Sequence, residues 1–301
     1  MRFSNFVPTS VMRTTMRLSA PRILSPSVPV RRQRYLLNVI GRLAVYPRDT
    51  TIERTTLGGR PCERILVAGA DQRRAVLYLH GGAYIVGGAG THRALAAHLA
   101  AACGAAVHLL DYRLAPEAPY PAAVEDTLAA YRELRETAGS VTVAGDSAGG
   151  GLTLVLLTRL RDAGEPLPEA AGLISPWVDL TLAHVEDEPR DPMLRRAWLA
   201  SGAEAYGSGT DPASPELSPL FADLAGLPPL IVQGASEEIL LGDVERLTAA
   251  LRSAGVSVEY QRLEGLWHAA PLQAGLVAAA TDAITAVGAF LKTAMEQPLR
   301  G

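Results

Sequence analysis

The apolar positions of this chain follow two alternating patterns from about residue 50 onward. Short unbroken apolar runs predict buried strands, and the stretches between them space their apolar residues three or four apart, as amphipathic helices do. The predicted strands are Thr50–Leu57, Cys62–Ala68, Ala75–Leu79, Ala106–Leu110, Ala170–Ile174, Leu230–Gln233 and Val256–Leu263. The predicted helices are Thr91–Ala102, Pro121–Thr137, Ser147–Ala163 and Val244–Ala254. This alternation predicts an α/β fold with a mostly parallel central sheet flanked by helices.

Turn and cap residues punctuate the pattern. Gly58-Gly59 joins the first two predicted strands as a hairpin, because glycine tolerates the positive φ of a two-residue turn. Gly104, Gly139 and Gly164 are natural ends for three of the helices. Asp243 is expected to be the N-cap of the helix that begins at Val244.

Two regions depart from the alternation. Residues 1–48 contain nine Arg and no Asp or Glu, and residues of about 180–218 are rich in acidic, Pro and Gly positions. We expect an N-terminal cap segment at 1–48, a catalytic domain at 49–301, and an insertion at 180–218 that completes a helical cap over the carboxyl ends of the strands. A transit peptide or a membrane-surface helix is the alternative for the basic segment.

Charge and cysteine content exclude several classes of protein. The 28 basic and 31 acidic residues give a net charge of -3, which does not favour nucleic acid as a partner. No apolar run has the length of a membrane span, so stable membrane insertion is not expected. Cys62 and Cys103 have neither the density of a disulfide scaffold nor metal-ligand spacing. These features predict a cytoplasmic protein.

The segment Gly145-Asp146-Ser147-Ala148-Gly149 carries the main chemical signal. It lies between an apolar run and a Leu-rich helical stretch, so Ser147 is placed where a strand turns into a helix. Side chains larger than hydrogen at the two flanking glycines would collide with the neighbouring backbone. Ser147 is therefore the candidate nucleophile.

A serine hydroxyl needs a base to accept its proton, and in this fold the base lies late in the chain. His92 and His98 fall in a predicted helix, His108 falls in a predicted strand, and His80 precedes the serine. His268 alone lies in a loop after a late strand. We therefore predict His268 as the general base.

The acid that orients the base is expected just beyond the strand that ends at Gln233. Three carboxylates lie there, on Glu237, Glu238 and Asp243. With Asp243 taken as a helix cap, Glu238 is the preferred acid and Glu237 the reserve.

Donors for the oxyanion are expected in the loop His80-Gly81-Gly82-Ala83-Tyr84, which follows a predicted strand. The backbone NH groups of Gly82 and Ala83, in a loop shaped by Gly81, are two candidate donors, and the NH of Ala148 is the third. The oxyanion hole is thus predicted from Gly81, Gly82, Ala83 and Ala148.

Together these motifs resemble those of the bacterial carboxylesterases related to hormone-sensitive lipase, within the α/β-hydrolase fold. The resemblance covers roughly residues 60 to 293 and includes the segments 111–117 (DYRLAPE) and 175–180 (SPWVDL). It implies a mobile cap and short-chain acyl esters as substrates. Two departures stand out. Ala83 replaces a third glycine, which adds a methyl group expected beside the acyl site, and Glu237-Glu238 stands where many members carry Asp-Pro.

Other charged and aromatic residues near these motifs have structural alternatives. Asp111, Arg113 and Glu117 are expected to form a buried network that anchors their loop, because a neutral ester offers them no charge to bind. The aromatic side chains that either line the acyl pocket or pack in the core are Tyr84, Trp177, Trp198 and Trp267.

The sequence therefore predicts a serine carboxylic-ester hydrolase for short- to medium-chain acyl esters, with lactones and acetyl esters included. Its partner is a small-molecule ester, and it requires no cofactor and no metal. An amidase or acyltransferase on the same residues is one alternative, and a non-catalytic ligand-binding receptor is another. A homodimer through the C-terminal edge is compatible with this fold.

Overall fold

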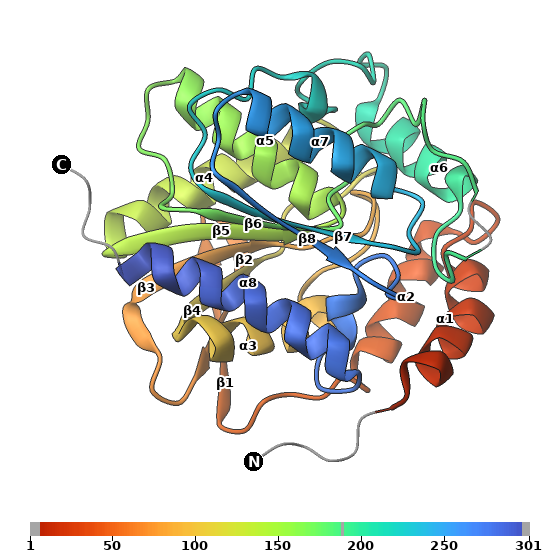
Figure 1. The fold of residues 1–301 in the computed structure, drawn as a ribbon, viewed down its shortest axis with the longest axis horizontal. Coiled ribbons are helices and arrows are strands. Elements are labelled where there is room, and N and C mark those ends of the chain that lie inside the picture. Colours follow the sequence, from red (N-terminus) through yellow and green to blue (C-terminus); the bar gives the residue numbers. More distant parts are fainter. Residues whose placement is uncertain (1–6, 188–189, 297–301) are drawn as a thin grey trace.

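The computed structural model describes residues 7–187 and 190–296, so residues 1–6 of the predicted cap segment, 188–189 of the insertion and 297–301 of the catalytic domain lie outside the described residues. The described part contains one eight-stranded sheet (Figure 1). Its strands are β1 (Thr50–Leu57), β2 (Arg60–Val67), β3 (Asp71–Leu79), β4 (Ala105–Leu110), β5 (Ser140–Asp146), β6 (Ala171–Ile174), β7 (Leu230–Ala235) and β8 (Val258–Leu263).

Helices connect and cover these strands. The α-helices are α1 (Thr9–Ile23), α2 (Val30–Gly41), α3 (Ala89–Cys103), α4 (Ala122–Thr137), α5 (Ala148–Asp162), α6 (Arg196–Gly207), α7 (Leu241–Ser253) and α8 (Ala278–Glu296). Two short 3-10 helices are η1 (Pro219–Phe221) and η2 (Ala270–Gln273). None of the described helices is long and apolar enough to cross a bilayer.

The sheet follows the order β1-β2-β4-β3-β5-β6-β7-β8. Strand β2 is antiparallel to both of its neighbours, β1 and β4, and β3 to β8 are parallel. After β3 the chain crosses first to β4 on one side and then to β5 on the other, which makes a topological switch point. Open α/β sheets bind ligands at such points. Leu79 pairs with both Leu110 and Gly145, so the three strands end together and their following loops meet.

Two layers of helices bury the sheet. In Figure 1, α4, α5 and α7 lie above the sheet and α3 and α8 lie below it. The apolar cores divide in the same way, with the α3 and α8 side chains in one cluster and those of α4, α5 and α7 in two others. Helix α5 is apolar on nearly all sides because it packs between the sheet on one side and α4 and η1 on the others.

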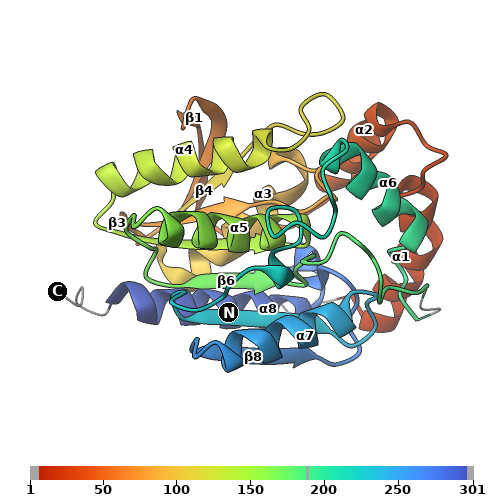
Figure 2. The same ribbon diagram turned by 90° about the horizontal axis from the view of Figure 1, so that it is seen from above.

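A third layer, formed by α1, α2 and α6, lies at the end toward which the strands point (Figure 2). Pro8 and Pro29 precede α1 and α2, where the missing proline N–H is no loss because the first turn has no internal acceptor. We call these three helices the covering layer. Its helices come from the N-terminal segment and from the insertion, regions far apart in the sequence.

The predicted α/β-hydrolase architecture is confirmed, with small corrections. The Gly58-Gly59 hairpin is present, with φ values of 58° and 73°. The N-cap prediction for Asp243 is wrong, because α7 begins at Leu241 and Asp243 lies in its first turn. Its carboxylate instead pairs with Arg246 at 2.8 Å.

Candidate active site

Ser147 lies at the tight junction of β5 and α5. Its backbone has φ 51° and ψ -120°, a conformation that costs energy for a non-glycine residue and that recurs at functional turns. A Cβ at Gly149 would overlap the carbonyl of Leu79, so the turn requires glycine there. The Ser147 side chain borders a cavity at the carboxyl ends of the strands.

His268 lies in the loop after β8 and borders the same cavity. Its Nδ1 is 2.7 Å from Oε2 of Glu238, and both side chains are buried. The other Glu238 oxygen accepts the backbone N–H of Ala235 at 2.9 Å, which fixes the carboxylate. Burial opposes the charged imidazolium, but the hydrogen bond and charge of Glu238 outweigh it and raise the pKa of His268 above its ordinary value.

Glu237 points away from His268 and toward the covering layer. Its carboxylate forms an ion pair with Arg13 of α1 at 2.9 Å. The same guanidinium donates to the carbonyl of Gly265 at 2.6 Å, three residues before His268. One arginine therefore ties α1 to the loop that carries the acid and to the loop that carries the histidine.

The loop after β3 brings Gly81 and Gly82 to the cavity wall, where Gly81 lies directly beside Ser147. The N–H of Gly81 donates to Oδ1 of Asp146 at 3.1 Å, so Gly81 anchors the loop and its N–H is already engaged. Positive φ angles at Gly82 and Ala83, 122° and 51°, turn the backbone sharply after this anchor. Ala148 is the first residue of α5, where N–H groups have no acceptor within the helix.

The methyl group of Ala83 does not lie beside the cavity, and the expectation that it borders the acyl site is wrong. Ala83 packs on Gly202 of α6, where an added Cβ would come within 2.8 Å of the Ala83 Cβ. The next residue, Tyr84, stacks on Tyr206 of α6 with ring centroids 3.8 Å apart. Ala83, which stands in place of a third glycine, is therefore in close contact with the covering layer.

The cavity itself is small and apolar, with a volume of about 90 Å³. The covering layer supplies much of its wall. Its apolar lining residues are Leu24, Leu37, Val86, Met193, Leu194, Trp198, Ala269 and Leu272. Of the four aromatic residues singled out from the sequence, Trp198 borders the cavity, whereas Tyr84, Trp177 and Trp267 are fully buried in the core. Drug-sized ligands need cavities several times larger, so this shape suits a small acyl group.

A buried polar cluster beside the nucleophile was not predicted. Asp146 accepts hydrogen bonds from Tyr78 Oη at 2.9 Å and from Gly81, and its second oxygen is 3.3 Å from Nε2 of His92. Burial opposes its charge, yet His92 and Tyr78 hold the pKa of Asp146 below its usual value. The sequence signal for this cluster was Asp146, a carboxylate inside the serine motif. His92 was set aside because it lies on a helix.

A second missed carboxylate, Asp191, lies in the insertion and is fully buried. One oxygen accepts the N–H groups of Met193 and Leu194 at 2.7 and 3.0 Å, and the other accepts the N–H of Ile239 at 3.1 Å. Ile239 directly follows Glu238. Asp191 thus joins the insertion to the loop of Glu238, and its charge contributes to raising the pKa of His268.

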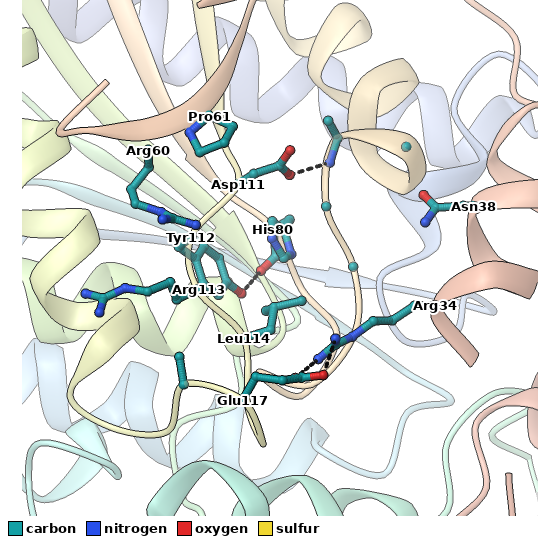
Figure 3. A pocket seen from close by; sticks show the side chains of 15 residues that line it. Arg34, Asn38, Arg60, Pro61, His80, Asp111, Tyr112, Arg113, Leu114 and Glu117 are labelled. Atoms are coloured by element: carbon teal, nitrogen blue, oxygen red, sulfur yellow. Dashed lines mark hydrogen bonds and ion pairs between the residues drawn. The ribbon is translucent and has the colours of Figure 1, made fainter. Parts of the chain in front are cut away.

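Figure 3 shows a separate, more open cavity of about 500 Å³ on the outer side of the loop after β3. Asp111, Arg113 and Glu117 border it but do not form one network. Asp111 accepts the N–H of Ala89 at 2.7 Å, Arg113 pairs with Asp126, and Glu117 pairs with Arg34 of α2. Ser147 and His268 are not among its lining residues.

His80 borders the open cavity. Its ring stacks on Tyr112 at 4.2 Å, and its Nδ1 is 2.9 Å from the carbonyl of Gly81. Burial lowers the pKa of His80 to about 3, so the ring is neutral and supports the loop. Among the described residues no three His, Cys, Asp or Glu side chains are grouped as metal ligands.

Comparisons with known proteins agree with this geometry. A family model described as the alpha/beta hydrolase fold matches residues 76–272. An acetyl-hydrolase of Streptomyces hygroscopicus is 44% identical over 86% of this chain and 87% of its own length. An esterase of Acinetobacter venetianus is 34% identical over 86% of both chains. A crystal structure of an esterase from the bacterial hormone-sensitive lipase family superposes with a TM-score of 0.90 and 37% identity, covering 95% of this chain and 98% of that one.

Proposed function

This chain belongs to the α/β-hydrolase family, among the bacterial hormone-sensitive lipase esterases, and on that premise we propose that Ser147, His268 and Glu238 are its catalytic triad. The chain is a serine carboxylic-ester hydrolase. The observation that supports these residue roles is the 2.7 Å contact between His268 Nδ1 and Glu238 Oε2, on a histidine that shares its cavity with the strained Ser147.

The proposed reaction passes through an acyl-enzyme. His268 accepts the hydroxyl proton of Ser147 as the serine oxygen attacks the ester carbonyl, and Glu238 holds the imidazole in one tautomer and stabilises its cation. His268 then returns the proton to the leaving alcohol. In the second half of the reaction, His268 accepts a proton from a water molecule as the water attacks the acyl-enzyme. His268 then gives that proton to the Ser147 oxygen as the acid is released.

The backbone N–H groups of Gly82, Ala83 and Ala148 are the proposed oxyanion donors. The engagement of the Gly81 N–H with Asp146 supports this assignment, because it leaves the next two N–H groups of the loop to face the reacting oxygen. Each such donor contributes about 3 kcal/mol to the stabilisation of the transition state.

The proposed substrates are esters with short acyl groups. The support is the apolar cavity of about 90 Å³, which is closed by Leu24 and Leu37 of the N-terminal segment and by Trp198 of α6. We therefore assign the cap function to the covering layer, drawn from residues 1–48 and 180–218. No observation favours the amidase or acyltransferase, and added alcohols would reveal the latter by diverting the acyl-enzyme from water.

Two further assignments remain proposals. A cytoplasmic location is supported by Cys62 and Cys103, which are buried as free thiols. A homodimer is supported by β8, which lies at the edge of the sheet. The backbone groups on the outer side of an edge strand are available for pairing with another chain.

The test is hydrolysis of p-nitrophenyl esters from acetate to palmitate. We expect a short-chain optimum, with the rate reduced about 10⁶-fold in Ser147→Ala and about 10⁴-fold in Glu238→Gln. Glu237→Gln is the matched control, because it removes the neighbouring charge and leaves the contact with His268 intact. A severe loss in Glu237→Gln with an active Glu238→Gln would reverse the assignment of the acid. An inactive wild type on every ester would overturn the esterase function.

A further inference from the structure

Exposed apolar side chains gather on the N-terminal helices. Eight large apolar side chains are exposed in the described part of the chain. Six of them belong to α1, to α2 or to the turn that ends α2: Val11, Leu18, Tyr35, Val39, Ile40 and Leu43. The other two, Ile52 and Phe221, lie elsewhere. Such a concentration marks an interaction surface more often than chance exposure does.

Helical spacing places these side chains on outward faces. Tyr35, Val39 and Leu43 follow one another at intervals of four, whereas Gln33 is buried and Leu37 borders the catalytic cavity on the opposite side. Exposed residues of α1 show the same division. Val11 and Leu18 are seven residues apart and exposed, while Met12 and Met16 pack against the core. Both helices therefore present one apolar face to the core and another outward.

The charge around these outward faces has one sign. Arg22, Arg31, Arg32 and Arg42 are exposed, and residues 7–48 contain no Asp or Glu. On a helical wheel of α2, Arg31 and Arg42 lie beside Tyr35 at one edge of the apolar stripe, and Arg32 lies within it, between Val39 and Leu43. An apolar stripe with arginines along one edge and within it matches the interfacial region of a bilayer with anionic headgroups.

We propose that the outward faces of α1 and α2 form a docking surface for an anionic lipid bilayer. A second copy of this chain is a poorer occupant, because a two-fold interface would bring the same arginine-rich faces together with no acidic residues of those helices to compensate. The docking is peripheral, since no described helix can span a bilayer. The covering layer lies over the catalytic cavity, so docking turns that end of the molecule toward the lipid (Figure 2).

The test is co-sedimentation of the full chain with vesicles of phosphatidylcholine alone or mixed with phosphatidylglycerol. We expect binding to the anionic vesicles only, and weaker binding at high salt. Combined substitution of Arg31, Arg32 and Arg42 by Gln is expected to weaken binding on the order of 100-fold, from the usual contribution of one arginine near such a surface. Combined substitution of Tyr35, Val39 and Leu43 by Ser is expected to weaken it as well.

Matched controls carry the same changes elsewhere. Gln at the exposed Arg73, Arg252 and Arg262, and Ser at the exposed Phe221, are expected to leave vesicle binding unchanged. Hydrolysis of a soluble ester by each variant checks that it is folded. No sedimentation with anionic vesicles, equal sedimentation with both vesicle types, or equal losses in the control variants would each overturn the proposal. A dimer in vesicle-free solution that the Ser substitutions at Tyr35, Val39 and Leu43 dissociate would assign the surface to a second copy instead.

Discussion

The strand-end loops and the covering layer are held by different kinds of contact. In the loops, buried carboxylates accept backbone N–H groups: Asp146 holds Gly81, Asp191 holds Ile239, and Glu238 holds Ala235. The covering layer packs on the core through apolar side chains such as Met16 and Tyr206, and its polar contacts are made by a few long side chains at its rim. Arg13 reaches the loops after β7 and β8, and Arg34 of α2 reaches the carbonyl groups of Ile85 and Ala115.

The two kinds of contact differ in strength. A buried hydrogen bond to a charged group contributes about 1.5–3 kcal/mol, whereas a partly exposed ion pair contributes about 0–1 kcal/mol. The polar contacts therefore fix the loops more firmly than they fix the helices above them. Variants of the loop contacts should change the chemical step, and variants of the rim contacts should change which esters enter.

Outside the proposed triad, the largest effect is expected from Asp146, which anchors the loop of the proposed oxyanion donors. Asp146→Ala removes the acceptor of Gly81, and we expect kcat to fall about 100-fold, comparable to loss of one oxyanion donor, with little change in KM. Asp146→Asn keeps a carbonyl oxygen and should lose less. Steady-state kinetics on p-nitrophenyl acetate measure both.

Asp126→Asn is the control for the loss of a buried carboxylate, because Asp126 of α4 pairs with Arg113 and does not border the cavity of Ser147. Thermal melting separates misfolding from a catalytic defect. A folded Asp146→Ala enzyme with wild-type kcat would show that the loop keeps its shape without this anchor, and the distinction between the two regions would lose its main support.

An intermediate effect is expected from Asp191, which is contributed by the insertion yet held like a loop residue. Asp191→Asn puts an amide where three N–H groups need acceptors, and we expect kcat/KM to fall about tenfold for the loss of one buried hydrogen bond. Its charge also raises the pKa of His268, and the base acts in its neutral form. Removing the charge lowers that pKa, so the acid limb of the pH profile should move to lower pH.

Asp243→Asn serves as the comparison, since it removes a buried carboxylate that pairs with Arg246. Its acid limb should match that of the wild type. An Asp191→Asn enzyme that is slower but has an unshifted acid limb would mean that Asp191 only supports the loop.

Sequence patterns predicted the strand-end loops far better than the covering layer. Ser147 and His268 follow from chain order, because unbroken apolar runs mark buried strands and the reactive residues directly follow them. Glu238 was preferred to Glu237 from the sequence, but no periodicity says which of two adjacent residues at a turn faces the histidine, and the contact of Glu238 with His268 is visible only in the structure. The partner of Glu237 is Arg13, which is more than two hundred residues earlier in the chain.

Contacts between residues far apart in the chain also explain which predictions were wrong or missing. Ala83 was expected beside the acyl site because only its own loop was considered, but its methyl group packs on Gly202, a contact that exists only once α6 folds over the loop. Asp146 and His92 were missed for a similar reason. Both belong to elements that were correctly predicted, yet their contact joins the ends of β5 and α3 through the sheet register.

The smallest effect on the chemical step is expected from Arg13, the rim contact between α1 and the two loops. Arg13→Gln removes the ion pair with Glu237, and we expect kcat on the acetate ester to change by roughly twofold at most. Because α1 leads directly into Leu24 at the cavity wall, its release should raise activity on longer acyl esters relative to acetate. Glu237→Gln should shift the chain-length profile in the same direction. The double variant should add little to the effect of Arg13→Gln, since the two substitutions remove the same ion pair. Arg252→Gln, remote from this rim, should leave the profile unchanged. If Arg13→Gln instead reduces kcat on every ester equally, then α1 holds the loop of His268 in its catalytic position. The contact of Arg13 would then be grouped with those that fix the strand-end loops.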